Sequence, residues 1–214
     1  MKEKKDKKVI GLTGTYCAGK NHVAFILEQR GLPVLDVDKL GHRVIEMEKD
    51  RLLARFGQDI LGPDGFIDRK RLGAKVFGSG GELAALEGII HPAVDREILD
   101  WIKSRKEKAC VINAALLHRS QSFGELYAVI VVDAPLHIRL LRAKRRDRLP
   151  WADLLKRFQS QKDILPQYLM EKTDTYRVEN PGFFSFRSRS LRLRLENRID
   201  EILSLKGIER DPNL

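Results

Sequence analysis

The clearest chemical signal in the sequence is a glycine-rich loop of the form G-x-x-x-x-G-K, from Gly14 to Lys20. It lies between a strand-like apolar run and a helical pattern, which is the context in which such a loop binds phosphate and not merely turns the chain. Backbone N–H groups and a helix N-terminus then surround the phosphate, and the lysine reaches its outer oxygens. The residues predicted to bind a nucleoside triphosphate, ATP, are Gly14, Thr15, Tyr16, Cys17, Ala18, Gly19, Lys20, Asn21 and His22.

Asn21 stands where such a loop normally carries a Ser or Thr hydroxyl that ligates Mg²⁺. An amide oxygen can bind a hard cation directly or through a retained water, so Asn21 remains a weak candidate metal ligand. His22 either contacts phosphate or is an ordinary helix-surface histidine. Cys17 is either a thiol activated by the loop amides and Lys20 or a passive small residue.

Two carboxylates, Asp36 and Asp38, end the second strand-like run. Alternation along a strand would send both to the same side, at the sheet edge where α/β proteins bind ligands. One of them can orient a hydroxyl acceptor and take its proton during phosphoryl transfer. The alternative for one of the two is an N-cap on the helix that follows.

A third set of chemical residues lies on a predicted helix from Leu136 to Arg148. Its arginines Arg139, Arg142 and Arg146 fall at i, i+3 and i+7 and therefore share a face. Guanidinium groups converging from one face can neutralise the charge that develops in phosphoryl transfer. We expect this helix to belong to a lid that closes over the nucleotide, the alternative being a solvated basic face.

The elements that must position these residues alternate between strand and helix. A strand, a helix over Gly19 to Arg30 and a second strand within about thirty residues form a crossover unit, so the sheet is parallel and the class is α/β. The predicted strands are Val9 to Gly14, Val34 to Asp38, Cys110 to Leu117, Tyr127 to Ala134 and, more weakly, Tyr176 to Asn180.

Two further helical patterns need interpretation. An apolar stripe runs from Glu82 to Trp101, but Pro92 interrupts it, which predicts two helical pieces with His91 at the joint. Near the C-terminus, residues 190–195 alternate like a strand, whereas the leucines and isoleucine from 191 to 203 fall four apart. The second pattern favours a terminal helix.

Composition bounds the class of protein. The chain has 214 residues, a formal net charge of +10 and two cysteines, so a secreted disulfide scaffold is not expected. The basic excess is concentrated in residues 1–8, 139–148 and 187–198, which suits a phosphate-rich ligand or a solvated surface. No apolar run reaches bilayer length and no signal peptide is evident, so we expect a cytoplasmic protein without membrane contact.

Taken together, these residues resemble the dephospho-coenzyme A kinase family over nearly the whole chain. Besides the loop with Gly11-Leu12-Thr13-Gly14, the resemblance rests on motifs spread along the sequence. They are residues 34–38 (VLDVD), residues 64–69 (DGFIDR) with Leu72 and Val76-Phe77, Ile90-His91-Pro92, Arg142 with Arg146-Asp147, Arg157 with Gln161, and Asp174 with Val178-Glu179-Asn180.

The resemblance implies transfer of the ATP γ-phosphoryl group to the ribose 3′-hydroxyl of dephospho-coenzyme A, with Mg²⁺. It implies a P-loop kinase with a parallel five-stranded sheet flanked by helices, in one domain over residues 1–214. The core would comprise residues 9–38, 107–138 and 172–206, with a helical substrate lobe at 39–106 and a lid at 139–171. The roles that it implies are Asp38 as catalytic base, Lys20 on the transferred phosphate, Arg142 and Arg146 in the lid, and Asp36, Arg69 and His91 on the acceptor side.

The chain departs from the family pattern in three places. Thr15 and Cys17 replace expected glycines, Asn21-His22 replaces a Ser-Thr pair, and residues 115–119 (ALLHR) lack the expected proline and acidic residue. Side chains at 15 and 17 would point outward where φ is negative and strain the loop where it is positive. The alternatives are therefore a related kinase of a nucleoside, nucleotide or small metabolite, or a catalytically weak ATP-binding protein. Nucleic-acid binding is not favoured, because no nucleic-acid motif accompanies the charge.

Overall fold

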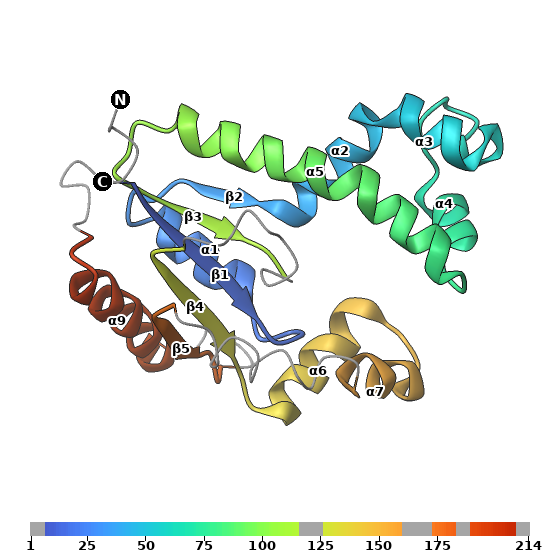
Figure 1. Ribbon diagram of the computed structural model, residues 1–214. Helices are drawn as coiled ribbons and strands as arrows, with labels where there is room; N and C mark the ends of the chain where they lie inside the picture. The colour runs from blue at the N-terminus through green and yellow to red at the C-terminus, as the bar shows by residue number, and fades with distance from the viewer. Residues whose placement is uncertain (1–6, 116–125, 160–172, 183–188, 209–214) are drawn as a thin grey trace. The chain divides into compact units, whose positions relative to one another are not determined.

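The computed structural model describes residues 7–115, 126–159, 173–182 and 189–208 (Figure 1). The chain divides into two compact units. The first comprises Met1–Val34 with Arg105–Leu214, and the second comprises Leu35–Ser104.

Among the described residues, the sheet has five strands in the order β2-β3-β1-β4-β5. Strand β1 pairs in parallel with β3 and β4, and β4 pairs in parallel with β5. Strands β3 and β4 are buried along their whole length, as expected of apolar strands covered on both faces. The predicted α/β class and parallel sheet are confirmed. The bounds are β1 Lys8–Gly14, β2 Val34–Asp36, β3 Ala109–Asn113, β4 Ala128–Asp133 and β5 Thr175–Glu179.

Helices α1 (Lys20–Glu28) and α9 (Arg189–Leu205) share one hydrophobic core with the sheet. The core joins Ile10 of β1 to Leu27 of α1 and Ile199 of α9, all almost completely buried. The terminal helix predicted from the four-residue spacing is confirmed. Because α1 begins directly after the glycine loop, this packing fixes the helix N-terminus that the loop leads into.

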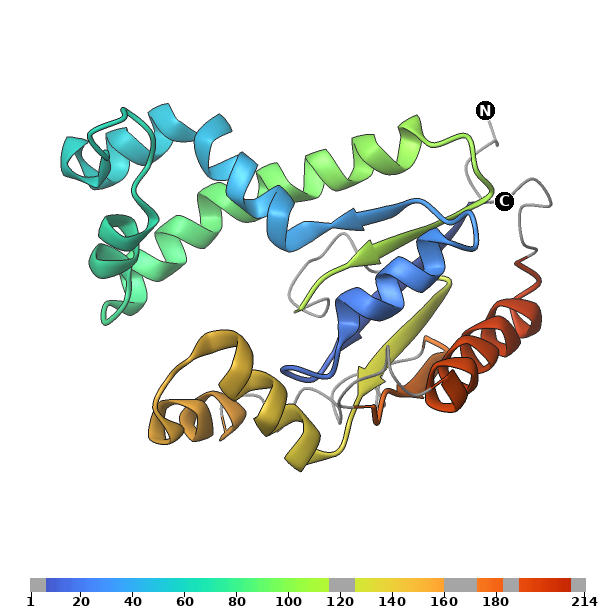
Figure 2. The same ribbon diagram turned by 180° about the vertical axis from the view of Figure 1, so that it is seen from behind.

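Helices α6 (Leu136–Asp147) and α7 (Trp151–Gln159) lie side by side in the first unit, as Figure 1 and Figure 2 both show. Arg148, in the left-handed conformation with φ 54°, ends α6. Ala143, Leu154 and Phe158 form their buried contact. The helix predicted over Leu136 to Arg148 is confirmed.

The second unit is helical beyond the end of β2. Its core is formed by residues from α3, η1 and α4 together with Ile67, and α5 packs against it through Leu83, Leu86, Ile89 and Ile90. Asp68 caps α4 by accepting hydrogen bonds from two backbone N–H groups. The bounds are α2 Val37–Met47, α3 Lys49–Phe56, η1 Gln58–Ile60, α4 Arg69–Val76 and α5 Gly80–Ser104.

The expected break at Pro92 is wrong, because α5 is one helix of 25 residues with Pro92 inside it. A proline inside a helix removes one hydrogen bond and crowds the carbonyl four residues earlier, at a cost of about 3 kcal/mol. Apolar residues continue on the same helix after the proline, with Ala93 and Ile98 buried. Their packing outweighs the local preference to break, as tertiary context often does.

The expected strand from Val34 to Asp38 is too long, since β2 ends at Asp36 and α2 begins at Val37. Asp36 is the N-cap of α2, its carboxylate accepting a hydrogen bond from Lys39 N at 3.1 Å. The alternation that would have paired Asp36 with Asp38 therefore does not apply, because Asp38 lies in the first helical turn. The N-cap alternative holds for Asp36.

The third strand ends at Asn113, earlier than Leu117. The departures at residues 116–119, Gln161, the part of the expected lid at 160–171 and most of the N-terminal basic segment lie outside the described residues. Among the helices that the structure describes, none combines the length and hydropathy needed to cross a bilayer.

The close approach of the loop to β4 generates the first prediction. A Cβ atom on Gly14 would lie 2.5 Å from the backbone oxygen of Val132, so Gly14→Ala should destabilise the protein by about 1–3 kcal/mol. Gly41→Ala is the control, because that Cβ meets nothing within 4 Å and alanine favours helix α2 by about 0.5–1 kcal/mol. Urea unfolding measures both, and equal stabilities would contradict the packing.

Candidate active site

The glycine loop between β1 and α1 is shaped by its two end glycines. Gly14 meets Val132 of β4 closely, and Gly19 has φ 94° with its Cβ direction blocked by the Asn180 amide at 2.3 Å. Neither position tolerates a side chain, which is the property that lets the backbone wrap around a phosphate. Lys20 begins α1, and its ammonium nitrogen is buried.

The two side chains that replace glycines behave differently. Thr15 is buried, and its hydroxyl donates to Asp133 Oδ1 at the end of β4, at 2.8 Å. Arg177 of β5 donates to the other oxygen of Asp133 at 2.7 Å. Thr15 thus points into the protein and not outward, and it anchors the loop. Cys17 has φ 60°, so the strain expected at a positive φ falls on Cys17, at a cost of about 1–3 kcal/mol.

Arg142 of α6 braces the loop. Its guanidinium donates to the carbonyl oxygens of Cys17 at 3.3 Å and Ala18 at 2.8 Å. It also donates to the carbonyl oxygens of Asn180, at 3.1 Å, and Gly182, after β5. The Asn180 amide adds a donor to the Ala18 carbonyl at 3.0 Å. Burial of this guanidinium lowers its pKa, but arginine is effectively always protonated in proteins, so the group stays charged.

The other two arginines of the α6 face also reach the loop. Arg139 donates from Nε to the Tyr16 carbonyl at 2.9 Å. Arg146 lies over the Tyr16 ring, 5.1 Å from its centroid, and donates to Asp147 at 2.7 Å. This hydrogen bond raises the pKa of Arg146 and lowers that of Asp147. The structure therefore brings all three predicted arginines to one loop.

Asn21, at the expected metal position, is exposed and lies beside the end of β3. Its Oδ1 accepts from the Asn113 amide at 3.4 Å. Asn113 is 2% exposed, and within the described part of the chain its Oδ1 has no hydrogen-bond partner. Sequence reasoning missed Asn113, although its place as the last residue of a buried strand beside the loop is a usable signal.

The two amides are compatible with Mg²⁺. Amide oxygens are among the hard ligands that Mg²⁺ accepts, usually with several waters retained. Of the residues that the structure describes, no group of three or more His, Cys, Asp or Glu side chains is arranged to hold a metal. A cation held by these two amides would keep further ligands from water or from the phosphates of a nucleotide.

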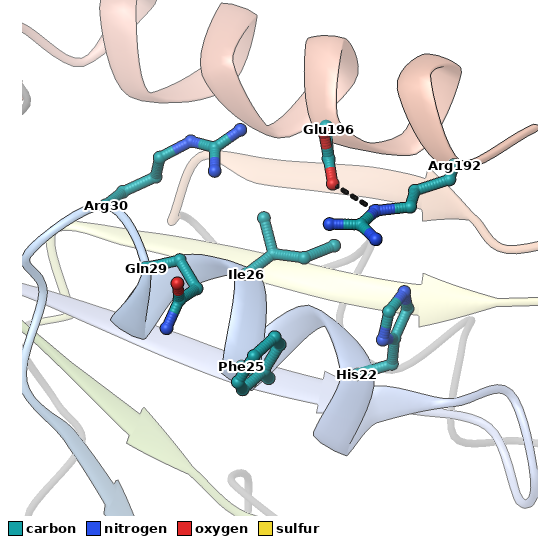
Figure 3. Close-up of a pocket in the computed structure, with 7 residues that line it drawn as sticks. All are labelled: His22, Phe25, Ile26, Gln29, Arg30, Arg192 and Glu196. Carbon is teal, nitrogen blue, oxygen red and sulfur yellow. Dashed lines mark hydrogen bonds and ion pairs between the residues drawn. The ribbon is translucent and has the colours of Figure 1, made fainter. Parts of the chain in front are cut away.

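His22 is turned toward a separate pocket of 410 Å³ between α1 and α9 (Figure 3). Burial lowers the pKa of its imidazole, so the neutral form is favoured. Arg192 forms an ion pair with Glu196 at 2.7 Å, and Arg30 pairs with Asp200 at 2.9 Å. The two arginines at this pocket are thus each paired with a carboxylate of the protein. The lining comprises His22, Phe25, Ile26, Gln29, Arg30, Arg192 and Glu196.

The candidate acceptor residues belong to the second unit. Asp38 is exposed in the first turn of α2, Arg69 is exposed at the first position of α4, and His91 is exposed in the middle of α5. Asp36 is partly buried at the N-cap of α2. The three exposed side chains come from three different helices of this unit, and none is part of its hydrophobic core.

A parallel sheet with a glycine-built loop before its first helix, braced by arginines, defines the class of P-loop phosphotransferases. Residues 8–173 match the family described as dephospho-CoA kinase. The chain belongs to the dephospho-CoA kinase family.

Named relatives agree with this assignment, and a solved structure has a similar fold. The chain is 32% identical over 183 residues to the dephospho-CoA kinase of Treponema denticola, covering 80% of this chain and 82% of that protein. It is 38% identical over 181 residues to that of Anaeromyxobacter dehalogenans, covering 82% and 84%. The crystal structure of TT1252 from Thermus thermophilus superposes with a TM-score of 0.77 at 28% identity, covering 94% of this chain and 98% of that one.

The brace formed by Arg142 generates the second prediction. Arg142→Lys should lower the free energy of unfolding by about 1–2 kcal/mol, because one ammonium group cannot reach carbonyls in both segments as the planar fork does. The matched control is Arg145→Lys, an exposed arginine of the same helix, which should change stability by less than about 0.5 kcal/mol. Urea unfolding measures both, and equal effects would show that the brace does not stabilise the loop.

Proposed function

We propose that the protein phosphorylates the ribose 3′-hydroxyl of dephospho-CoA with ATP, giving CoA and ADP in the last step of CoA synthesis. The observation that carries the proposal is the loop whose end glycines, Gly14 and Gly19, admit no side chain and which leads into Lys20. Family membership supplies the acceptor. In this proposal the reaction uses ATP as the phosphoryl donor and takes place in the cytoplasm.

In this proposal the loop from Gly14 to His22 holds the phosphates of ATP. Backbone N–H groups bind the oxygens, and Lys20 interacts with the phosphoryl group in both the ground state and the transition state. Arg142 and Arg146 act from a lid at residues 139–171, stabilising charge as it spreads over the transferred group. The contacts of Arg142 support this role indirectly, because they hold its guanidinium against the loop carbonyls of Cys17 and Ala18.

The acceptor binds in the helical lobe at residues 39–106, with Asp36, Arg69 and His91 on its side of the reaction. Asp38 accepts the proton of the ribose hydroxyl as the new bond to phosphorus forms. Its place supports this role, since it is exposed directly after the carboxyl end of β2, where α/β folds bind ligands. Asp36 contributes chiefly as the N-cap that sets the start of α2.

Asn21 and Asn113 would hold Mg²⁺, in part through water. Bound Mg²⁺ would neutralise negative charge on the phosphates. The support is the buried Asn113 Oδ1 described above, which faces no donor among the described residues, and the neighbouring Asn21 amide.

An ADP-release assay tests the function directly. With Mg²⁺-ATP, dephospho-CoA should stimulate ADP release, whereas adenosine, AMP and shikimate should not. Lys20→Ala should weaken both ATP use and transfer, and full activity in that variant would contradict the loop assignment. Stimulation by a nucleoside alone would instead identify a kinase of similar build, and ATP binding without turnover would identify a non-catalytic relative.

The substitution Asp38→Asn tests whether Asp38 is the general base. Turnover should fall by roughly 10²-fold or more, the usual contribution of a general base, while ATP affinity stays nearly unchanged. Steady-state kinetics and calorimetric ATP titration measure the two quantities. Asp36→Asn is the matched control, because asparagine still caps a helix. If the Asp36 variant loses as much turnover as the Asp38 variant, the assignment of a single base is wrong.

The substitution Asn21→Ser tests whether residue 21 contributes to Mg²⁺ binding. A hydroxyl at this position is a direct Mg²⁺ ligand, so the Mg²⁺ concentration for half-maximal activity should fall, by roughly ten-fold as is typical around bound metals. Asn21→Ala should move it in the opposite direction. Both are read from activity titrated with Mg²⁺ at fixed ATP. Identical titration curves for the three proteins would remove Asn21 from the metal site.

A further inference from the structure

Tyr16, in the middle of the phosphate loop, makes contacts that a loop of this kind does not need for binding phosphate. Its ring meets Phe158 of α7 edge-on, with centroids 5.2 Å apart. Together with Cys17 it packs against the buried cluster of Ala143, Leu154 and Phe158. The loop is therefore part of the apolar contact between α6 and α7.

The hydroxyl of Tyr16 extends this contact into a polar network. It donates to the carboxylate of Asp147, the last residue of α6, and Arg157 of α7 donates to both groups at 3.4 Å. Asp147 also accepts from Arg146, whose guanidinium lies over the Tyr16 ring. Two cations and one phenol thus share a single carboxylate, and such charge-assisted hydrogen bonds are the stronger kind.

The backbone of the same residue is held as well. Arg139 donates to the Tyr16 carbonyl, and its guanidinium lies 5.0 Å from the Phe158 ring centroid. Residues of α6 and α7 therefore bind Tyr16 through its ring, its hydroxyl and its carbonyl.

We propose that Tyr16 is a positioning residue that attaches the phosphate loop to α6 and α7 and sets the position of Arg146 beside the loop. We call its contacts with Phe158, Asp147 and Arg139 the clasp. The contacts of the clasp do not depend on what the protein does, whereas their importance for catalysis rests on the proposed kinase activity. When the clasp is closed, the arginines of α6 are already aligned with the loop before a nucleotide arrives. Opening it would free the loop and lose that alignment.

Cys17 provides a natural probe of the clasp. It adjoins Tyr16 and packs on the same cluster, and burial raises the pKa of its thiol, so it reacts slowly while the clasp is closed. The other cysteine of the chain, Cys110, is completely buried in β3. Modification of the folded protein by 5,5′-dithiobis(2-nitrobenzoic acid) therefore reports on Cys17, and Cys17→Ser gives the background rate.

The experiment compares Cys17 labelling without nucleotide in wild type, Tyr16→Phe, Asp147→Asn and the double variant. Tyr16→Phe keeps the ring and loses only the hydroxyl, so labelling should be roughly ten-fold faster or more, as expected for losing a hydrogen bond to a charged group. The double variant should label no faster than the faster single variant, because both changes break one interaction. Tyr127→Phe is the matched control, since that hydroxyl bonds only the Lys206 carbonyl among the described residues, and its labelling should match wild type.

Steady-state kinetics supply the second measurement. Tyr16→Phe should raise the KM for ATP several-fold while the melting temperature stays near that of Tyr127→Phe, which separates positioning from general stability. Unchanged Cys17 labelling in Tyr16→Phe, or additive rates in the double variant, would overturn the proposal. Because labelling needs no catalysis, it can succeed where kinase activity is absent, so failure of the clasp and failure of the proposed function are distinguishable.

Discussion

The site depends on one steric constraint, the approach of the loop backbone to β4. Gly14 pairs with Val132 in the parallel sheet, and the space beyond its Cα is occupied by the Val132 carbonyl. Only glycine fits there, so the chain can leave β1 and turn at once into the loop. The core packing of α1 then fixes where the turn ends, and the loop has little freedom between these two boundaries.

Within those boundaries, charged side chains hold the loop in place. Arg142 and Arg139 donate to its carbonyl oxygens, while Thr15 hydrogen-bonds the Asp133 carboxylate. A loop held in this way needs little further ordering when a ligand arrives, which lowers the entropic cost of binding. The strained backbone of Cys17 is tolerated because the surrounding contacts outweigh it.

One departure from the family pattern, Asn21, lies beside a second amide, that of Asn113. Asn21 and Asn113 put neutral amides beside each other at the expected metal position, so these two residues contribute dipoles and no negative charge there. A cation held there depends more on the phosphates of its nucleotide than one held by a carboxylate. Tyr16, in the same loop as Asn21, contacts α7 through its ring and α6 through its hydroxyl.

The amino-acid sequence was enough to predict the class of fold, the phosphate loop and the arginine face of α6, because each depends on the spacing of nearby residues: buried apolar runs, glycines five residues apart, and arginines at helical intervals. It also allowed an N-cap at Asp36. The three-dimensional contacts were needed to show that α5 continues through Pro92, that Thr15 turns inward, that Asn113 lies beside Asn21, and that the Tyr16 side chain contacts α6 and α7. These outcomes depend on partners far away in the chain, such as Asp133 and Asp147, and no local pattern encodes a contact between distant segments.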